Sequence, residues 1–165
     1  MLRSSCRLSL AKCLHYRTAS MLRMTLAGGL HEWKYMRSIL LVEDHPAFAN
    51  VIARLLHKTG DLEVSLVAKT GEIALQHLSK QEFDLAIVDV FLPGMSGIAL
   101  VGLIHDQYPA LPCMMLSGHM LDYYVKLALK AGARGYVLKD NTAGILEGIQ
   151  KVLRGETYVS KELHA

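Results

Sequence analysis

The feature that most constrains the fold of this chain is a regular alternation of short apolar runs with segments of helical periodicity. Short runs rich in β-branched residues suit strands that are covered on both faces, as in a parallel sheet. Five such runs are expected as strands, at residues 39–42, 62–67, 85–88, 113–116 and 136–138. The segments between them repeat apolar residues at helical spacing, so strand and helix alternate along the chain.

Local signals set the limits of the helices. Pro46 suits a first helical turn, because the N–H that proline lacks would have no partner there. Gly60 stops this helix, and Thr70 is a cap for the next one. Further helices are expected at about 72–78, 96–106, 121–131 and 142–154. Five strand–helix units with short loops predict an α/β fold, a doubly wound parallel sheet with right-handed crossovers and helices on both faces.

Apolar residues make up 52% of the chain, a high share for a soluble protein. A membrane helix needs roughly 18–20 consecutive apolar residues, and no run approaches this length. The three cysteines form an odd set without a CxxC pair, which predicts neither a metal site nor a disulfide framework. We therefore expect a cytoplasmic protein with a layered core and no membrane contact.

Residues 1–36 differ from the rest and are expected to form a basic N-terminal extension. Residues 1–35 carry six Lys/Arg and one acid, whereas the remaining residues carry twelve Lys/Arg and fourteen acids. The Arg- and Ser-rich composition is typical of a transit peptide. A secretory signal is less favoured, because Arg7 and Lys12 interrupt any apolar segment. The favoured interpretation is a translation start at Met36, with the extension mis-assigned or disordered. The mildly acidic remainder gives no indication of nucleic-acid binding.

Polar side chains follow four of the five expected strands. In open parallel sheets, ligands bind outside the carboxyl ends of the strands, where the strand order reverses. Glu43 and Asp44 follow the first strand, Asp89 the third, Ser117 the fourth and Lys139 the fifth. Three crowded carboxylates repel one another, and oxygen ligands at this density favour Mg²⁺. The ammonium of the lysine is a second positive charge, suited to a phosphoryl oxygen.

These groups together indicate phosphoryl-transfer chemistry. An aspartate is a capable nucleophile toward phosphorus. With a metal ion and a lysine to neutralise charge, the transfer needs mainly positioning and electrostatics. The residues therefore predict an aspartyl phosphate, but they do not say which aspartate is the nucleophile.

Four sequence blocks, in this order and each at a strand end, resemble the receiver domain of bacterial two-component response regulators. The blocks are 41–46 (LVEDHP), 87–97 (IVDVFLPGMSG), 116–118 (LSG) and 135–140 (GYVLKD). The resemblance covers residues 37–154 and implies a flavodoxin-like (βα)5 sheet with strand order 2-1-3-4-5. The Lys139-Asp140 pair is usual in the NarL/LuxR-type subclass. Many receivers have proline at the second position, so Asp140 puts a cis peptide at this bond in doubt.

The resemblance also implies a role for each site residue. It makes Asp89 the phosphoacceptor and Asp44 a direct Mg²⁺ ligand, with Glu43 assisting through water. The backbone carbonyl of Phe91 is the expected third protein ligand.

Two further groups are implied to bind the phosphoryl group, namely the hydroxyl of Ser117 and the ammonium of Lys139. Tyr136 resembles the aromatic switch residue that turns inward when the hydroxyl residue moves toward the phosphate.

The implied function is that of a response regulator receiver in a phosphorelay. It accepts phosphate from a histidine kinase or phosphotransfer protein and acts on a downstream protein partner or as a homodimer. It is not an enzyme, beyond assisting its own Mg²⁺-dependent phosphorylation and dephosphorylation. Residues 155–165 resemble the start of a linker to a helix-turn-helix domain, and we expect no DNA-binding domain in this chain. It is then a stand-alone receiver or the remnant of a truncated transcriptional regulator.

Two alternatives belong to other functional classes. A haloacid-dehalogenase-type phosphatase also uses an aspartyl phosphate, but it needs a second Asp where Phe91 stands. A non-phosphorylated pseudo-receiver would keep the fold as an interaction module. The presence of all five site groups disfavours this second alternative.

Overall fold

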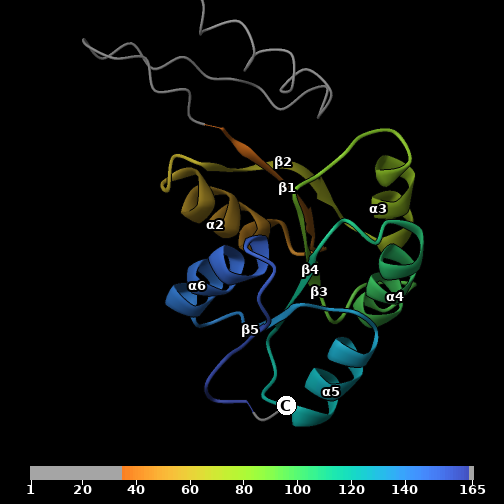
Figure 1. The fold of residues 1–165 in the computed structure, drawn as a ribbon, viewed down its shortest axis with the longest axis vertical. Helices are drawn as coiled ribbons and strands as arrows, with labels where there is room; N and C mark the ends of the chain where they lie inside the picture. Colours follow the sequence, from red (N-terminus) through yellow and green to blue (C-terminus); the bar gives the residue numbers. More distant parts are fainter. Residues whose placement is uncertain (1–34, 164–165) are drawn as a thin grey trace, which may run out of the picture. The chain divides into compact units, whose positions relative to one another are not determined.

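The computed structural model describes residues 35–163. The expectations for residues 1–34 lie outside this range. From Arg37 onward, strands and helices alternate as the sequence predicts (Figure 1). The strands are β1 (Arg37–Val42), β2 (Leu62–Ala68), β3 (Leu85–Asp89), β4 (Cys113–Ser117), β5 (Gly135–Leu138) and β6 (Tyr158–Val159). The helices are α2 (Pro46–His57), α3 (Gly71–Leu78), α4 (Gly97–Gln107), α5 (Asp122–Lys130) and α6 (Thr142–Leu153).

The strands form one parallel sheet with the order β2-β1-β3-β4-β5-β6. Helices α2 and α6 lie on one face, and α3, α4 and α5 lie on the other (Figure 1). This arrangement confirms the predicted doubly wound, flavodoxin-like fold. The chain leaves β1 for the β2 edge and then returns to β3, so the strand order reverses between the carboxyl ends of β1 and β3.

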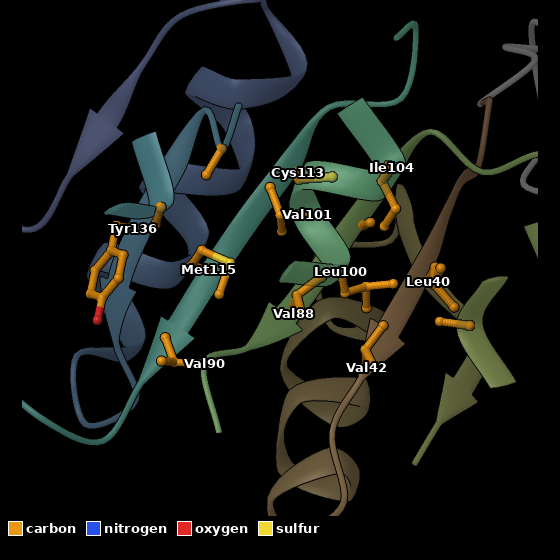
Figure 2. Close-up of a cluster of buried hydrophobic side chains, with 14 of the residues drawn as sticks. Leu40, Val42, Val88, Val90, Leu100, Val101, Ile104, Cys113, Met115 and Tyr136 are labelled. Atoms are coloured by element: carbon orange, nitrogen blue, oxygen red, sulfur yellow. The ribbon is translucent and has the colours of Figure 1, made fainter. Parts of the chain in front are cut away.

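Each central strand is buried on both faces, which explains why the apolar runs are continuous. In β1, the side chains of Leu40 and Val42 join the cluster beneath α3, α4 and α5, which Figure 2 shows. Ile39 and Leu41 join the cluster beneath α2 and α6. Successive strand residues point to opposite faces, so a strand between two helical layers needs apolar residues at every position.

Helix starts follow the capping signals in the sequence. The Thr70 side chain accepts a hydrogen bond from the Ile73 N–H and caps α3 as predicted. Ser96 caps α4 in the same way, by accepting from the Ala99 N–H. Such caps satisfy N–H groups that have no partner within the helix. Among residues 35–163, no helix combines the length and apolar character needed to cross a membrane.

The sixth strand was not predicted. Residues 155–163, interpreted from the sequence as the start of a linker, fold back along β5. Tyr158 and Leu163 are buried. The Ser160 N–H donates to the Tyr136 carbonyl at 3.0 Å, and the Leu138 N–H donates to Ser160 Oγ at 3.3 Å. A two-residue strand has no readable period, so only its pairing with β5 reveals it.

Candidate functional site at the carboxyl ends of the strands

The predicted site residues gather at the point where the strand order reverses. The Glu43 N–H donates to the Ala68 carbonyl at 2.9 Å, which extends the β1–β2 pairing into the site. Asp89 and Ser117 are the last residues of β3 and β4. The Lys139 N–H donates to the Ser117 carbonyl at 2.8 Å, so the β4–β5 ladder positions the lysine backbone.

Lys139 joins two buried carboxylates. Its Nζ donates to Glu43 Oε2 at 2.7 Å and to Asp89 Oδ2 at 2.8 Å. The lysine side chain is 19% exposed, whereas the Glu43 and Asp89 side chains are 0% and 6% exposed. Burial acts to lower the pKa of Lys139, but the hydrogen bonds to Asp89 and Glu43 outweigh it and raise this pKa. The ammonium is therefore charged at neutral pH, between two groups that attract it.

Asp44 and His45 lie at the open side of the site. Asp44 Oδ1 lies 3.1 Å from His45 Nδ1, and the His45 N–H donates to Glu43 Oε1 at 3.1 Å. Glu43, Asp44 and His45 bring one ligand atom each within 4.8 Å of one another. Mg²⁺ prefers oxygen ligands, so the two carboxylates suit it and the exposed imidazole does not. This group does not include Asp89, whose oxygens face Lys139 Nζ and the Phe91 N–H.

The loop after β3 holds the second oxygen of Asp89. Asp89 Oδ1 accepts from the Phe91 N–H at 3.3 Å. Gly97, at the start of α4, lies so close to the end of β3 that an added Cβ would be 1.8 Å from the Asp89 carbonyl oxygen. The sequence shows this glycine, but only the packing shows why a side chain is excluded. The absence of a side chain at Gly97 allows α4 to begin against the strand end that carries Asp89.

The Ser117 hydroxyl is held by the loop that follows β4. It is fully buried, donates to the His119 carbonyl at 3.0 Å and accepts from the His119 N–H at 3.1 Å. Ser117 therefore lies at the site as predicted, with its proton directed to its own loop.

Tyr136 lies inward, within the cluster beneath α3, α4 and α5 (Figure 2). The side chain is fully buried, and its hydroxyl has no hydrogen-bond partner among the described residues. Burial raises the pKa of this hydroxyl, and the nearby Ser117 side chain offsets only part of the rise. The structure thus shows the inward orientation, whereas the switch role stays a prediction.

Aromatic rings border the site on two sides. Phe91 is exposed and makes edge-to-face contacts with the rings of His119 and Tyr124, each at 5.4 Å between centroids. The Phe48 ring lies on the other side, with its centroid 4.7 Å from Lys139 Nζ. The sequence did not predict the contact between Phe48 and Lys139, because a phenylalanine in the first turn of a helix carries no signal for a distant lysine.

The response regulator receiver domain family matches residues 39–154 of this chain. The transcriptional regulatory protein DegU of Brevibacillus brevis is 30% identical over 122 residues, which cover 73% of this chain and 52% of DegU. The transcriptional activator protein ExaE of Pseudomonas putida is 34% identical over 126 residues, which cover 76% of this chain and 59% of ExaE. The chain thus spans between half and three fifths of the length of these relatives.

Solved structures show the same fold. A LuxR-family two-component response regulator from Aurantimonas sp. SI85-9A1 matches with a TM-score of 0.74 and 26% identity, covering 77% of this chain and 91% of that one. The signal receiver domain of the putative response regulator NarL from Mycobacterium tuberculosis matches with a TM-score of 0.69 and 26% identity. The match covers 73% of this chain and 98% of that one.

Receiver domains are generally non-enzymatic phosphoacceptors that typically bind Mg²⁺ and partner with histidine kinases. The similarity to these proteins agrees with the parallel sheet of order 2-1-3-4-5-6 and with the polar residues at the strand ends. This chain belongs to the response regulator receiver domain family of two-component systems.

Proposed function

We propose that this receiver domain is a phosphorylation switch in which Asp89 accepts a phosphoryl group from a histidine kinase or phosphotransfer protein. The observation that carries the proposal is the position of Lys139 Nζ, which bonds Asp89 Oδ2 and Glu43 Oε2 together. A nucleophilic carboxylate beside a fixed cation, at the point where the strand order reverses, is the arrangement that phosphoryl transfer needs.

In the proposed transfer, a carboxylate oxygen of Asp89 attacks the phosphorus of a phosphohistidine. The new O–P bond forms as the N–P bond breaks, and the donor imidazole leaves with the bonding electron pair. Lys139 moves from the carboxylate oxygen to a phosphoryl oxygen, a short displacement for a flexible side chain. Ser117 exchanges its bond to the His119 carbonyl for one to the phosphoryl group.

The oxygen-rich site fits Mg²⁺. Glu43, Asp44 and Asp89, with the backbone carbonyl of Phe91, would hold the ion, and it would neutralise charge on the phosphoryl oxygens. The Glu43 side chain is fully buried and also faces Lys139. This position suits a role through an intervening water rather than a direct bond, as the resemblance implies.

The signal would leave the domain through the inward Tyr136 and the α5, β5 and α6 elements around it. A downstream protein partner or a second copy of the chain would read this surface in the cytoplasm. The Ser160 N–H and Oγ bond the backbone of Tyr136 and Leu138, so a change in β5 also reaches the β6 segment.

The test uses the full chain with Mg²⁺ and acetyl phosphate, or with a phosphorylated histidine kinase, followed by intact-mass measurement. The wild-type chain should gain one phosphoryl group, and Asp89→Asn should gain none. The absence of an adduct on the wild-type chain, or an equal adduct on the variant, would contradict the proposal.

The same preparation separates the two alternatives. A pseudo-receiver should show no change in amide NMR signals near Asp44 when Mg²⁺ is added. A phosphatase should turn over a generic phosphomonoester, which this site does not favour because Phe91 stands where the second aspartate is required.

A further inference from the structure

Phe48 is an aromatic residue beside the site to which the proposed mechanism assigns no part. It lies in the first turn of α2, two residues after Pro46, which fixes the start of the helix. Its ring is half-buried, and its centroid is 4.7 Å from Lys139 Nζ. The contact joins α2 to the residue that follows β5, a strand separated from β3 by β4.

The reach of Lys139 makes such a contact useful. From the end of β5 the side chain crosses β4 to reach Asp89 on β3, and it also bonds Glu43 after β1, two strands away from β4. Lysine carries its charge on a flexible stem, so each contact that restricts the stem helps to keep the ammonium in place. A cation over an aromatic face is favoured electrostatically, by roughly 2- to 30-fold in an equilibrium constant, with the larger value at desolvated sites.

We propose that Phe48 is a positioning residue, whose ring face holds the Lys139 ammonium between Asp89 and Glu43 and keeps it aligned for a phosphoryl oxygen. This inference rests on the proposed function, because the lysine acts on the phosphoryl group that Asp89 accepts. The ring also supplies a weakly polar surface in place of water, which strengthens the attraction between the ammonium and the two carboxylates.

The competing explanation is packing. Phe48 also contacts the cluster beneath α2 and α6, so its loss would disturb the core whatever it does for the lysine. Variants of similar size separate the two roles. Methionine fills irregular space without a ring, and tyrosine keeps the ring. Val51 lies on the same helix and is 52% exposed, so Val51→Ala is the matched control for a change in α2.

The experiment measures the initial rate of Asp89 phosphorylation in the full chain, with acetyl phosphate and Mg²⁺, by intact mass. Phe48→Met should lower the rate by roughly 2- to 30-fold, and Phe48→Tyr should stay within about two-fold of the wild type. Val51→Ala should leave it unchanged. If Phe48→Met keeps the wild-type rate, or if Phe48→Tyr is as slow as Phe48→Met, the ring has no positioning role.

If Phe48→Met does not fold, an NMR measurement on the wild type and on Phe48→Tyr tests the same inference. The ε-methylene protons of Lys139 should resonate upfield of those of the other lysines in the wild type and in Phe48→Tyr, because the ring shields them. Unshifted signals would overturn the inference without any kinetic measurement. A wild-type chain that takes up no phosphoryl group would instead overturn the proposed function, and this inference with it.

Discussion

Ser160 Oγ accepts a hydrogen bond from the Leu138 N–H at 3.3 Å, one residue before the site lysine. Both residues are buried, and the Ser160 N–H also donates to the Tyr136 carbonyl. The segment after α6 is thus bonded on both sides of Val137, in the strand that carries Tyr136 and leads into Lys139. The stability of this strand should therefore depend on the β6 segment.

Ser160→Ala should lower the free energy of unfolding by about 1–3 kcal/mol, because it leaves the buried Leu138 N–H without its acceptor. Urea unfolding of the full chain measures the change. The control is Ser79→Ala, at an exposed serine that donates to the Gln76 carbonyl at the end of α3. Ser79→Ala should change the free energy of unfolding by no more than about 0.5 kcal/mol. Equal effects of the two variants would show that the β6 segment does not support β5.

Gly97→Ala should be strongly destabilising, whereas Gly102→Ala in the same helix should not. A Cβ at Gly97 would lie 1.8 Å from the Asp89 carbonyl oxygen, so α4 or the end of β3 must move. Overpacking of this kind typically costs about 1–3 kcal/mol or more. A Cβ at Gly102 meets nothing within 4 Å, and alanine there should stabilise the helix by roughly 0.5–1 kcal/mol.

Denaturant unfolding of the two glycine variants gives the comparison, and the phosphorylation assay adds a second readout. Gly97→Ala should also slow phosphorylation, since the displaced strand end carries Asp89. A Gly97→Ala protein with wild-type stability and rate would mean that the close approach of α4 to β3 is not required.

Tyr136→Phe should be neutral or stabilising. The buried Tyr136 hydroxyl has no partner among the described residues, and an unpaired buried hydroxyl costs about 1–3 kcal/mol. Tyr158→Phe is the contrasting variant, because the Tyr158 hydroxyl donates to Glu147 Oε2 at 3.2 Å. Thermal unfolding should show a Tm for Tyr136→Phe at or above that of the wild type. A lower Tm would show that its hydroxyl makes a favourable interaction in the folded protein.

The pH dependence of stability should report the ion pairs of Lys139. The folded state raises its pKa, because the hydrogen bonds to Asp89 and Glu43 outweigh burial. The stabilisation of the folded state by these ion pairs is therefore fully present below the pKa of a lysine in the unfolded chain, about 10.4. It is lost as the pH rises through the higher folded value.

Urea unfolding of the wild type and of Lys139→Met across neutral to alkaline pH measures this contribution. The difference between their free energies of unfolding should be constant up to about pH 9 and should shrink above about pH 10.4. A difference that grows with pH in the alkaline range would mean that the pKa of Lys139 is lowered by folding.

The sequence predicted the parts of this molecule that depend on local patterns. Continuous apolar runs indicated buried parallel strands, and Thr70 marked the start of a helix that the structure also caps there. Since parallel strands present their carboxyl ends at one edge, the residues after them could be assigned to one site. The charges at the strand ends indicated that Lys139 neutralises negative charge at this site, and the resemblance implied that it binds the phosphoryl group.

Other features required the tertiary structure, because they join segments that share no sequence pattern. Lys139 Nζ reaches Glu43 across 96 positions of sequence, and its distance to the Phe48 ring depends on how α2 packs. The short β6 strand exists only because β5 offers it an edge. Local periodicity thus determined which elements form and which groups end them. The packing of the helices against the sheet decided which of those groups touch, because it places residues that are distant in the sequence next to one another.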